Sequence, residues 1–91
     1  MMRQIEVRVF GRVQMVMFRD FTQRKARGLG VVGMVMNLKD GSVRVVAQAD
    51  ELVLKKFISL ISKGSFLSRV DNISVLWQEP TESFSDFKIL Y

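Results

Sequence analysis

The spacing of apolar residues changes repeatedly along this chain, and the order of these changes limits the folds it can adopt. Within the segment 3–10, apolar Ile5, Val7 and Val9 alternate with charged residues, which predicts a half-buried strand. From Phe18 onward the apolar residues recur at helical spacing, and Gly28 and Gly30 supply stop signals. The chain therefore begins with a strand followed by a helix.

The middle of the chain predicts a β-hairpin. Residues 31–37 and 43–49 are rich in β-branched and other apolar side chains. Asp40 and Gly41 lie between them, and both residue types tolerate the positive φ angles that tight hairpin turns require. We therefore expect two adjacent antiparallel strands here.

A second helix and two further strands complete the pattern. Asp50 is expected to cap a helix that ends at Gly64, and an alternating segment then leads to Trp77, which is expected to pack in the core. Residues 87–91 predict a short closing strand. The order β-α-β-β-α-β, with two right-handed crossovers, predicts an α+β ferredoxin-like sandwich. Its antiparallel sheet would carry both helices on one face, with a short extra C-terminal strand.

The length of 91 residues allows one modest hydrophobic core, so we expect a single domain over residues 1–91. The longest apolar runs are too short to span a bilayer, and an acidic residue lies where a signal peptide needs an apolar segment. We therefore expect a cytoplasmic monomer with no membrane partner.

The chain contains neither cysteine nor histidine. Disulfides, thiolate nucleophiles and zinc–thiolate sites are therefore excluded, and so is the most common general base. An enzyme built from this sequence would act through positioning and electrostatics.

The net charge of +5 has three possible explanations: a nucleic-acid surface, attraction of a small anionic substrate, or solubility. The basic residues are scattered, and the nearest approach to a cluster is the segment 24–27. We interpret that segment as the solvated end of a helix, where the dipole favours cations.

The junction between the first strand and the first helix is the strongest candidate for a site. A helix N-terminus presents unpaired backbone N–H groups and a positive partial charge to an anion. Arg19 lies at the start of this helix and adds a guanidinium suited to phosphate oxygens. The alternative is an ordinary strand–helix turn with a surface arginine.

Two motifs strengthen the first interpretation because they resemble signatures of the acylphosphatase family. The first is similar to the family pattern G-x-V-Q-G-V-x-F-R, and the second to G-W-V-x-N-x-x-D-G-x-V. They are Gly11-x-Val13-Gln14-x-Val16-x-Phe18-Arg19 and Gly33-Met34-Val35-Met36-Asn37-Leu38-Lys39-Asp40-Gly41-Ser42-Val43. The closing segment 87–91 resembles the family's last strand, so the resemblance covers essentially the whole chain.

The resemblance implies hydrolysis of acyl phosphates to a carboxylate and inorganic phosphate, without metal or cofactor. Arg19 and the loop backbone would bind the phosphoryl group, and Asn37 would orient the attacking water. The substrate-binding loop would comprise Met15, Val16, Met17, Phe18 and Arg19. Charge stabilisation and an in-line water are what a loose phosphoryl-transfer transition state needs.

Two positions leave alternatives open. Asn37 precedes a hairpin turn, where asparagine is commonly a turn-forming residue. Met15 replaces the family's glycine, so it would strain a positive-φ backbone, crowd the anion, or point harmlessly into solvent. A catalytically weak acyl-phosphate-binding or anion-binding module is therefore the second hypothesis.

RNA binding is a more distant third hypothesis, because RNA-recognition modules share this order of elements. Those modules stack bases on aromatic side chains of their central strands. The corresponding strands here carry mainly valine and isoleucine, so no nucleic-acid partner is expected.

Overall fold

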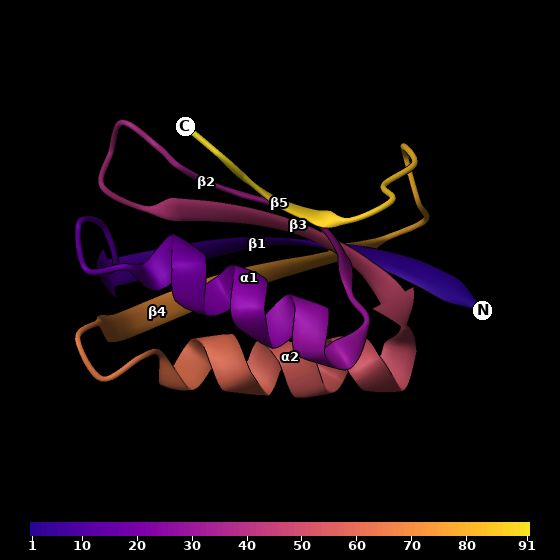
Figure 1. Ribbon diagram of the computed structural model, residues 1–91, viewed down its shortest axis with the longest axis horizontal. Coiled ribbons are helices and arrows are strands. Elements are labelled where there is room, and N and C mark those ends of the chain that lie inside the picture. The colour runs from indigo at the N-terminus through magenta and orange to yellow at the C-terminus, as the bar shows by residue number, and fades with distance from the viewer.

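The computed structural model describes residues 1–91 and contains five strands and two helices (Figure 1). Both helices pack against the same face of the sheet (Figure 1), which is the ferredoxin-like arrangement expected from the sequence. Neither helix is long and apolar enough to cross a membrane. The elements are β1 (Met2–Arg12), α1 (Phe18–Leu29), β2 (Val32–Asn37), β3 (Val43–Asp50), α2 (Glu51–Lys63), β4 (Arg69–Gln78) and β5 (Phe87–Leu90).

The five strands lie in the order β4-β1-β3-β2-β5. The first four are antiparallel to their neighbours, as expected, but β5 pairs in parallel with β2 and makes the sheet mixed. The reason is the connection 79–86, which carries the chain from β4 at one edge to β2 at the other. Gln4 donates to the Thr81 hydroxyl at 3.0 Å, and Gln48 donates to the Glu82 carbonyl at 2.6 Å, so this connection is pinned to the sheet.

Strand β1 is longer than the sequence pattern predicts, because it continues beyond an irregularity at Phe10 and Gly11. Gly11 has a φ of 132°, and a Cβ at this position would lie 2.2 Å from the Arg69 carbonyl oxygen. Only glycine allows β1 and β4 to approach so closely. The continuation leads β1 to the start of the loop that precedes α1.

The hydrophobic core lies between the sheet and the two helices. It contains 17 buried residues, contributed by alternate positions of the strands and by one stripe of each helix. Full burial of a side chain such as Phe18 or Phe57 contributes about 1.5–3 kcal/mol. Trp77 was expected to pack in the core; it is half-buried and packs against this cluster without belonging to it.

Helix α1 ends at Leu29, one residue after Gly28, which was expected to be one of its stop signals. Gly28 lies inside the helix, whereas Gly30 caps it with a φ of 74°. The N–H of Gly30 reaches the last helical carbonyls, and this left-handed geometry is what terminates a helix. Only Gly30 of the two glycines adopts it.

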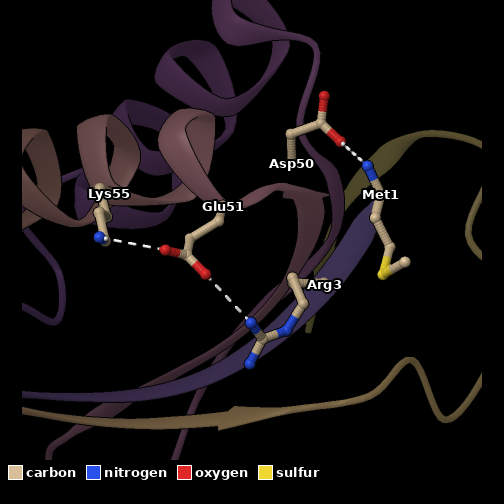
Figure 2. Close-up of polar contacts among 5 residues, drawn as sticks. All are labelled: Met1, Arg3, Asp50, Glu51 and Lys55. Carbon is tan, nitrogen blue, oxygen red and sulfur yellow. Dashed lines mark hydrogen bonds and ion pairs between the residues drawn. The ribbon is translucent and has the colours of Figure 1, made fainter.

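Asp50 occupies the N-cap position of α2, but its carboxylate makes no capping hydrogen bond. It accepts instead from the Met1 ammonium at 3.0 Å, and Glu51 lies between Arg3 at 3.1 Å and Lys55 at 3.2 Å (Figure 2). These exposed pairs each contribute at most about 1 kcal/mol. They join the beginning of β1 to the beginning of α2.

Candidate active site

The connection between β1 and α1 presents unpaired backbone donors at a helix N-terminus. Met17 is the N-cap residue of α1 and provides no side-chain cap. The first backbone hydrogen bond of the helix runs from the Phe21 N–H to the Met17 carbonyl at 3.0 Å. The backbone N–H groups of Met15, Val16 and Met17 have no acceptor within the chain. This loop therefore carries both free donors and the positive end of the helix dipole.

Two methionines of this loop adopt the left-handed conformation. Met15 and Met17 both have a φ of 61°, and their exposed fractions are 99% and 66%. From the sequence, backbone strain was one alternative for Met15 only. The structure shows the same left-handed conformation at Met17 as well. The side chain of Met15 points into solvent, so the backbone is strained but the loop is not crowded.

A pocket of about 550 Å³ lies beside this loop. Arg19 projects into it from the first turn of α1, and its guanidinium lies 4.8 Å from the centre of the Tyr91 ring. A long contact of 3.5 Å to the Leu90 carbonyl is its only hydrogen bond, so most of its donors are free for an anion. The pocket is lined by Val13, Met15, Met17, Phe18, Arg19, Asp20, Ile89 and Tyr91.

Asp20 is the one acidic residue of the pocket and would repel a bound anion. Its carboxylate accepts a hydrogen bond from Arg24 at 3.0 Å, one helical turn further along α1. This pair compensates part of the negative charge of Asp20. The pocket also holds the nearly unpaired guanidinium of Arg19, which attracts anions.

The candidate loop residues contribute in different ways. The Phe18 side chain is buried in the core, so only its backbone is available to a ligand. Val16 packs against the core and lines a second pocket with Phe66 and Leu67, on the other side of the loop. Met15, Met17 and Arg19 lie at the lining of the first pocket.

Asn37 lies apart from the pocket lining, at the end of β2, where it is opposite Val43 in the strand ladder. Its Oδ1 atom is buried and has no hydrogen-bond partner. The turn is instead stabilised by Asp40, whose carboxylate accepts from the Ser42 N–H at 2.9 Å. Asn37 is therefore not the residue that forms the turn.

The hydrogen bonds of Ser42 also act on Asp40 itself. Its hydroxyl and backbone N–H, and to a lesser extent the charge of Arg8, hold the pKa of the Asp40 carboxyl below its ordinary value of 3.8. Asp40 is thus ionised and serves the turn, as its position beside Gly41 indicates. No group of three or more acidic, histidine or cysteine side chains gathers in an arrangement that could hold a metal ion.

Gln14 connects the loop to the hairpin, and sequence analysis assigned it no role. Its Nε2 donates to the carbonyl oxygens of Leu38 and Ser42, both at 2.8 Å. The turn immediately after Asn37 is therefore tied to the loop that precedes Arg19. The only sign of this role in the sequence was that Gln14 is the uncharged polar residue of the first motif.

The sheet face opposite the helices offers little for base stacking. Arg8 and Arg44 lie on this face, but they are paired with Asp40 at 3.6 Å and Glu6 at 2.7 Å. Phe10 is the only aromatic residue that β1 and β3 contribute, and it is half-buried. These observations do not favour RNA as a partner.

Comparisons with known proteins agree with this geometry. The family model described as acylphosphatase matches residues 5–89. An acylphosphatase of Thermotoga maritima is 46% identical over 90 residues, covering 99% of each chain, and one of Lactobacillus johnsonii is 43% identical over 91 residues, covering 99% of this chain and 100% of the other. The crystal structure of acylphosphatase from Bacillus subtilis superposes with a TM-score of 0.94 at 37% identity, covering 98% of this chain and 99% of that one.

The family model spans almost the whole chain, the relatives match it over their full length, and the pocket has the anion-binding donors that such an enzyme needs. The chain therefore belongs to the acylphosphatase family and is a hydrolase that acts on the acid anhydride bond of acyl phosphates.

Proposed function

We propose that Arg19 and the backbone N–H groups of the loop from Met15 to Arg19 bind the phosphoryl group, and that Asn37 orients the attacking water. The observation that carries this proposal is that a loop with free N–H groups, a helix N-terminus and a nearly unpaired guanidinium lie beside one pocket. Such an arrangement binds anions without a metal.

Asn37 is assigned to the water because its Oδ1 is an acceptor that nothing in the chain uses. A buried acceptor without a partner is unfavourable, and a water molecule would satisfy it. The amide accepts a hydrogen bond from water but is not a strong base, so it orients the nucleophile without deprotonating it.

The chemistry makes modest demands on the remaining residues. Water attacks phosphorus in line, the bond from phosphorus to the acyl oxygen breaks, and the electron pair leaves on the carboxylate. The products are the carboxylate and inorganic phosphate, with the protons of water passing to phosphate and solvent. A carboxylate is a stable leaving group, so stabilisation of charge on the transferring phosphoryl group dominates the catalysis.

Phosphate release from benzoyl phosphate tests both assignments. Arg19→Ala is expected to lower kcat/KM by about 100- to 1000-fold, the usual effect of removing a donor to a developing charge. It should also abolish competitive inhibition by inorganic phosphate. Arg27→Ala is the matched control, because this exposed arginine is paired with Asp86 at the other end of α1.

Asn37→Ala is expected to behave differently, lowering kcat by about 100-fold while inhibition by inorganic phosphate stays unchanged. An Asn37→Ala variant with parental kcat would contradict the role in water positioning. An Arg19→Ala variant that still binds phosphate like the parent would contradict the role in phosphoryl binding.

We further propose that one copy of the chain forms the complete site, because every residue invoked above comes from a single chain. Specific activity should then be independent of protein concentration, and sedimentation should give a mass near 10.5 kDa. The cytoplasmic location expected from the sequence stays a prediction.

A further inference from the structure

The side chain of Gln14 is the point at which two separate parts of the site are joined. Its two amide hydrogens are directed to two carbonyls, those of Leu38 and Ser42, each at 2.8 Å. The Ser42 carbonyl also accepts from the Leu38 N–H at 2.9 Å, which closes the hairpin turn. Gln14 therefore holds a turn whose own geometry is already defined.

The loop itself has few contacts that could hold it in place. Val13 and Phe18, at its two ends, are buried among the core residues, and between them only Val16 packs against the core. Met15 and Met17 are exposed and strained, so their side chains do not anchor it. The cross-link by Gln14 is thus the polar tie between the loop and the rest of the site.

The other half of the site is rigid. Asn37 belongs to the hydrogen-bonded ladder of β2 and β3, where it lies opposite Val43. Leu38, the first acceptor of Gln14, is the next residue along the chain. A shift of the loop relative to this turn would change the distance between the bound phosphoryl group and the amide of Asn37.

We propose that Gln14 is a positioning residue, which sets the phosphate-binding loop at the distance from Asn37 that in-line attack by water requires. This inference rests on the roles proposed above for the loop and for Asn37. The Nε2 atom of Gln14 has no hydrogen left for the phosphoryl group, because both of its amide hydrogens are already donated. Displacement of a reacting group by about 1 Å reduces the rate by about 100-fold.

The first test replaces Gln14 with methionine, which has a similar length but no donor. Gln14→Met should lower kcat for benzoyl phosphate by about 10- to 100-fold. The inhibition constant for inorganic phosphate should stay within about twofold of the parent, because the loop donors and Arg19 are intact. Gln14→Glu, whose carboxylate cannot donate to the two carbonyls, should show at least as large a loss.

Gln48→Met is the matched control, because the Nε2 atom of Gln48 also makes two hydrogen bonds, to Gln4 at 2.8 Å and to the Glu82 carbonyl at 2.6 Å. These bonds lie near the other end of β3. Gln48→Met should lower the Tm at least as much as Gln14→Met does. At temperatures at which Gln48→Met is folded, its kcat should equal that of the parent. Equal losses of kcat in the two variants would overturn the inference.

A double-mutant cycle with Asn37→Ala separates the two proposals. If Gln14 acts through the placement of Asn37 and its water, Gln14→Met should lower kcat in the parent but not further in Asn37→Ala. Losses that multiply in the double variant would overturn the role of Gln14 and leave that of Asn37 standing. A parental kcat in Asn37→Ala alone would instead overturn the proposed water positioning, and this inference with it.

Discussion

Two left-handed methionines are the most unusual residues of the loop. An L-residue in this conformation is less stable than in the right-handed region by about 1–2 kcal/mol. Neither Met15 nor Met17 recovers this energy through packing, since both side chains are largely exposed. The N–H groups of this loop are left without acceptors in the chain, and strain of this kind collects at functional sites.

Met15→Gly should therefore relieve strain. Glycine adopts a φ of 61° without steric penalty but loses more chain entropy on folding, so we expect a net stabilisation of about 0.5–1 kcal/mol. For a chain of this size the Tm should rise by about 2–8 °C, measurable by calorimetry. Activity should stay within a few-fold of the parent because the thioether of Met15 lies in solvent. A lower Tm in Met15→Gly would contradict the proposed backbone strain at Met15.

At the scale of an element, the same residue type has opposite effects in a helix and in a strand. Gly28 lies within α1, and a Cβ there would meet no atom within 4 Å. Gly33 lies in β2 with a φ of 149°, and a Cβ would fall 1.9 Å from the Val46 carbonyl oxygen. The first glycine weakens its element, whereas the second allows β2 and β3 to pair.

Alanine substitutions should show this contrast. Gly28→Ala is expected to stabilise the protein by about 0.5–1 kcal/mol through helix propensity. Gly33→Ala should destabilise it by about 3 kcal/mol, because backbone atoms of β3 would have to move. Urea denaturation of both variants measures the two free energies of unfolding, and a tolerated Gly33→Ala would contradict the close approach of the strands.

At the scale of the whole molecule, Asp86 connects the last strand, β5, to the rest of the fold. Its backbone carbonyl accepts from Gly33 at 2.9 Å, while its carboxylate accepts from Phe87 at 2.7 Å and from Arg27 at 2.9 Å. The Phe87 N–H first, and then the Arg27 guanidinium, lower the pKa of this carboxyl from its ordinary value of 3.8. One side chain thus joins β5 to α1.

A lowered pKa in the folded state implies a definite pH dependence. The contribution of Asp86 is complete above its ordinary value of 3.8 and is lost as pH falls through the lower folded value. Asp86→Asn should therefore have a lower Tm than the parent at pH 7, and the difference should be smaller at pH 2, below the ordinary value of 3.8. Thermal unfolding followed by circular dichroism at the two pH values measures this, and a constant difference would show that protonation of Asp86 is not responsible.

Much of the architecture could be predicted from local patterns. The helical spacing after Phe18, the Asp40–Gly41 turn and the cap at Gly30 each depend on residues within a few positions of one another, and all appear in the structure. The extra length of β1 and the parallel pairing of β5 could not be predicted. Both depend on contacts between distant segments, such as Gly11 with β4 and Gln48 with Glu82.

The candidate site divides in the same way. Sequence by itself determined the loop, Arg19 and Asn37 as candidates, because each belongs to a motif of neighbouring residues. Only the tertiary structure decided that Met15 and Met17 are strained yet exposed, that Tyr91 lies beside Arg19, and that Gln14 joins the loop to the turn. The physical reason is that side-chain direction and long-range hydrogen bonds are set by how the elements pack, which local spacing does not encode.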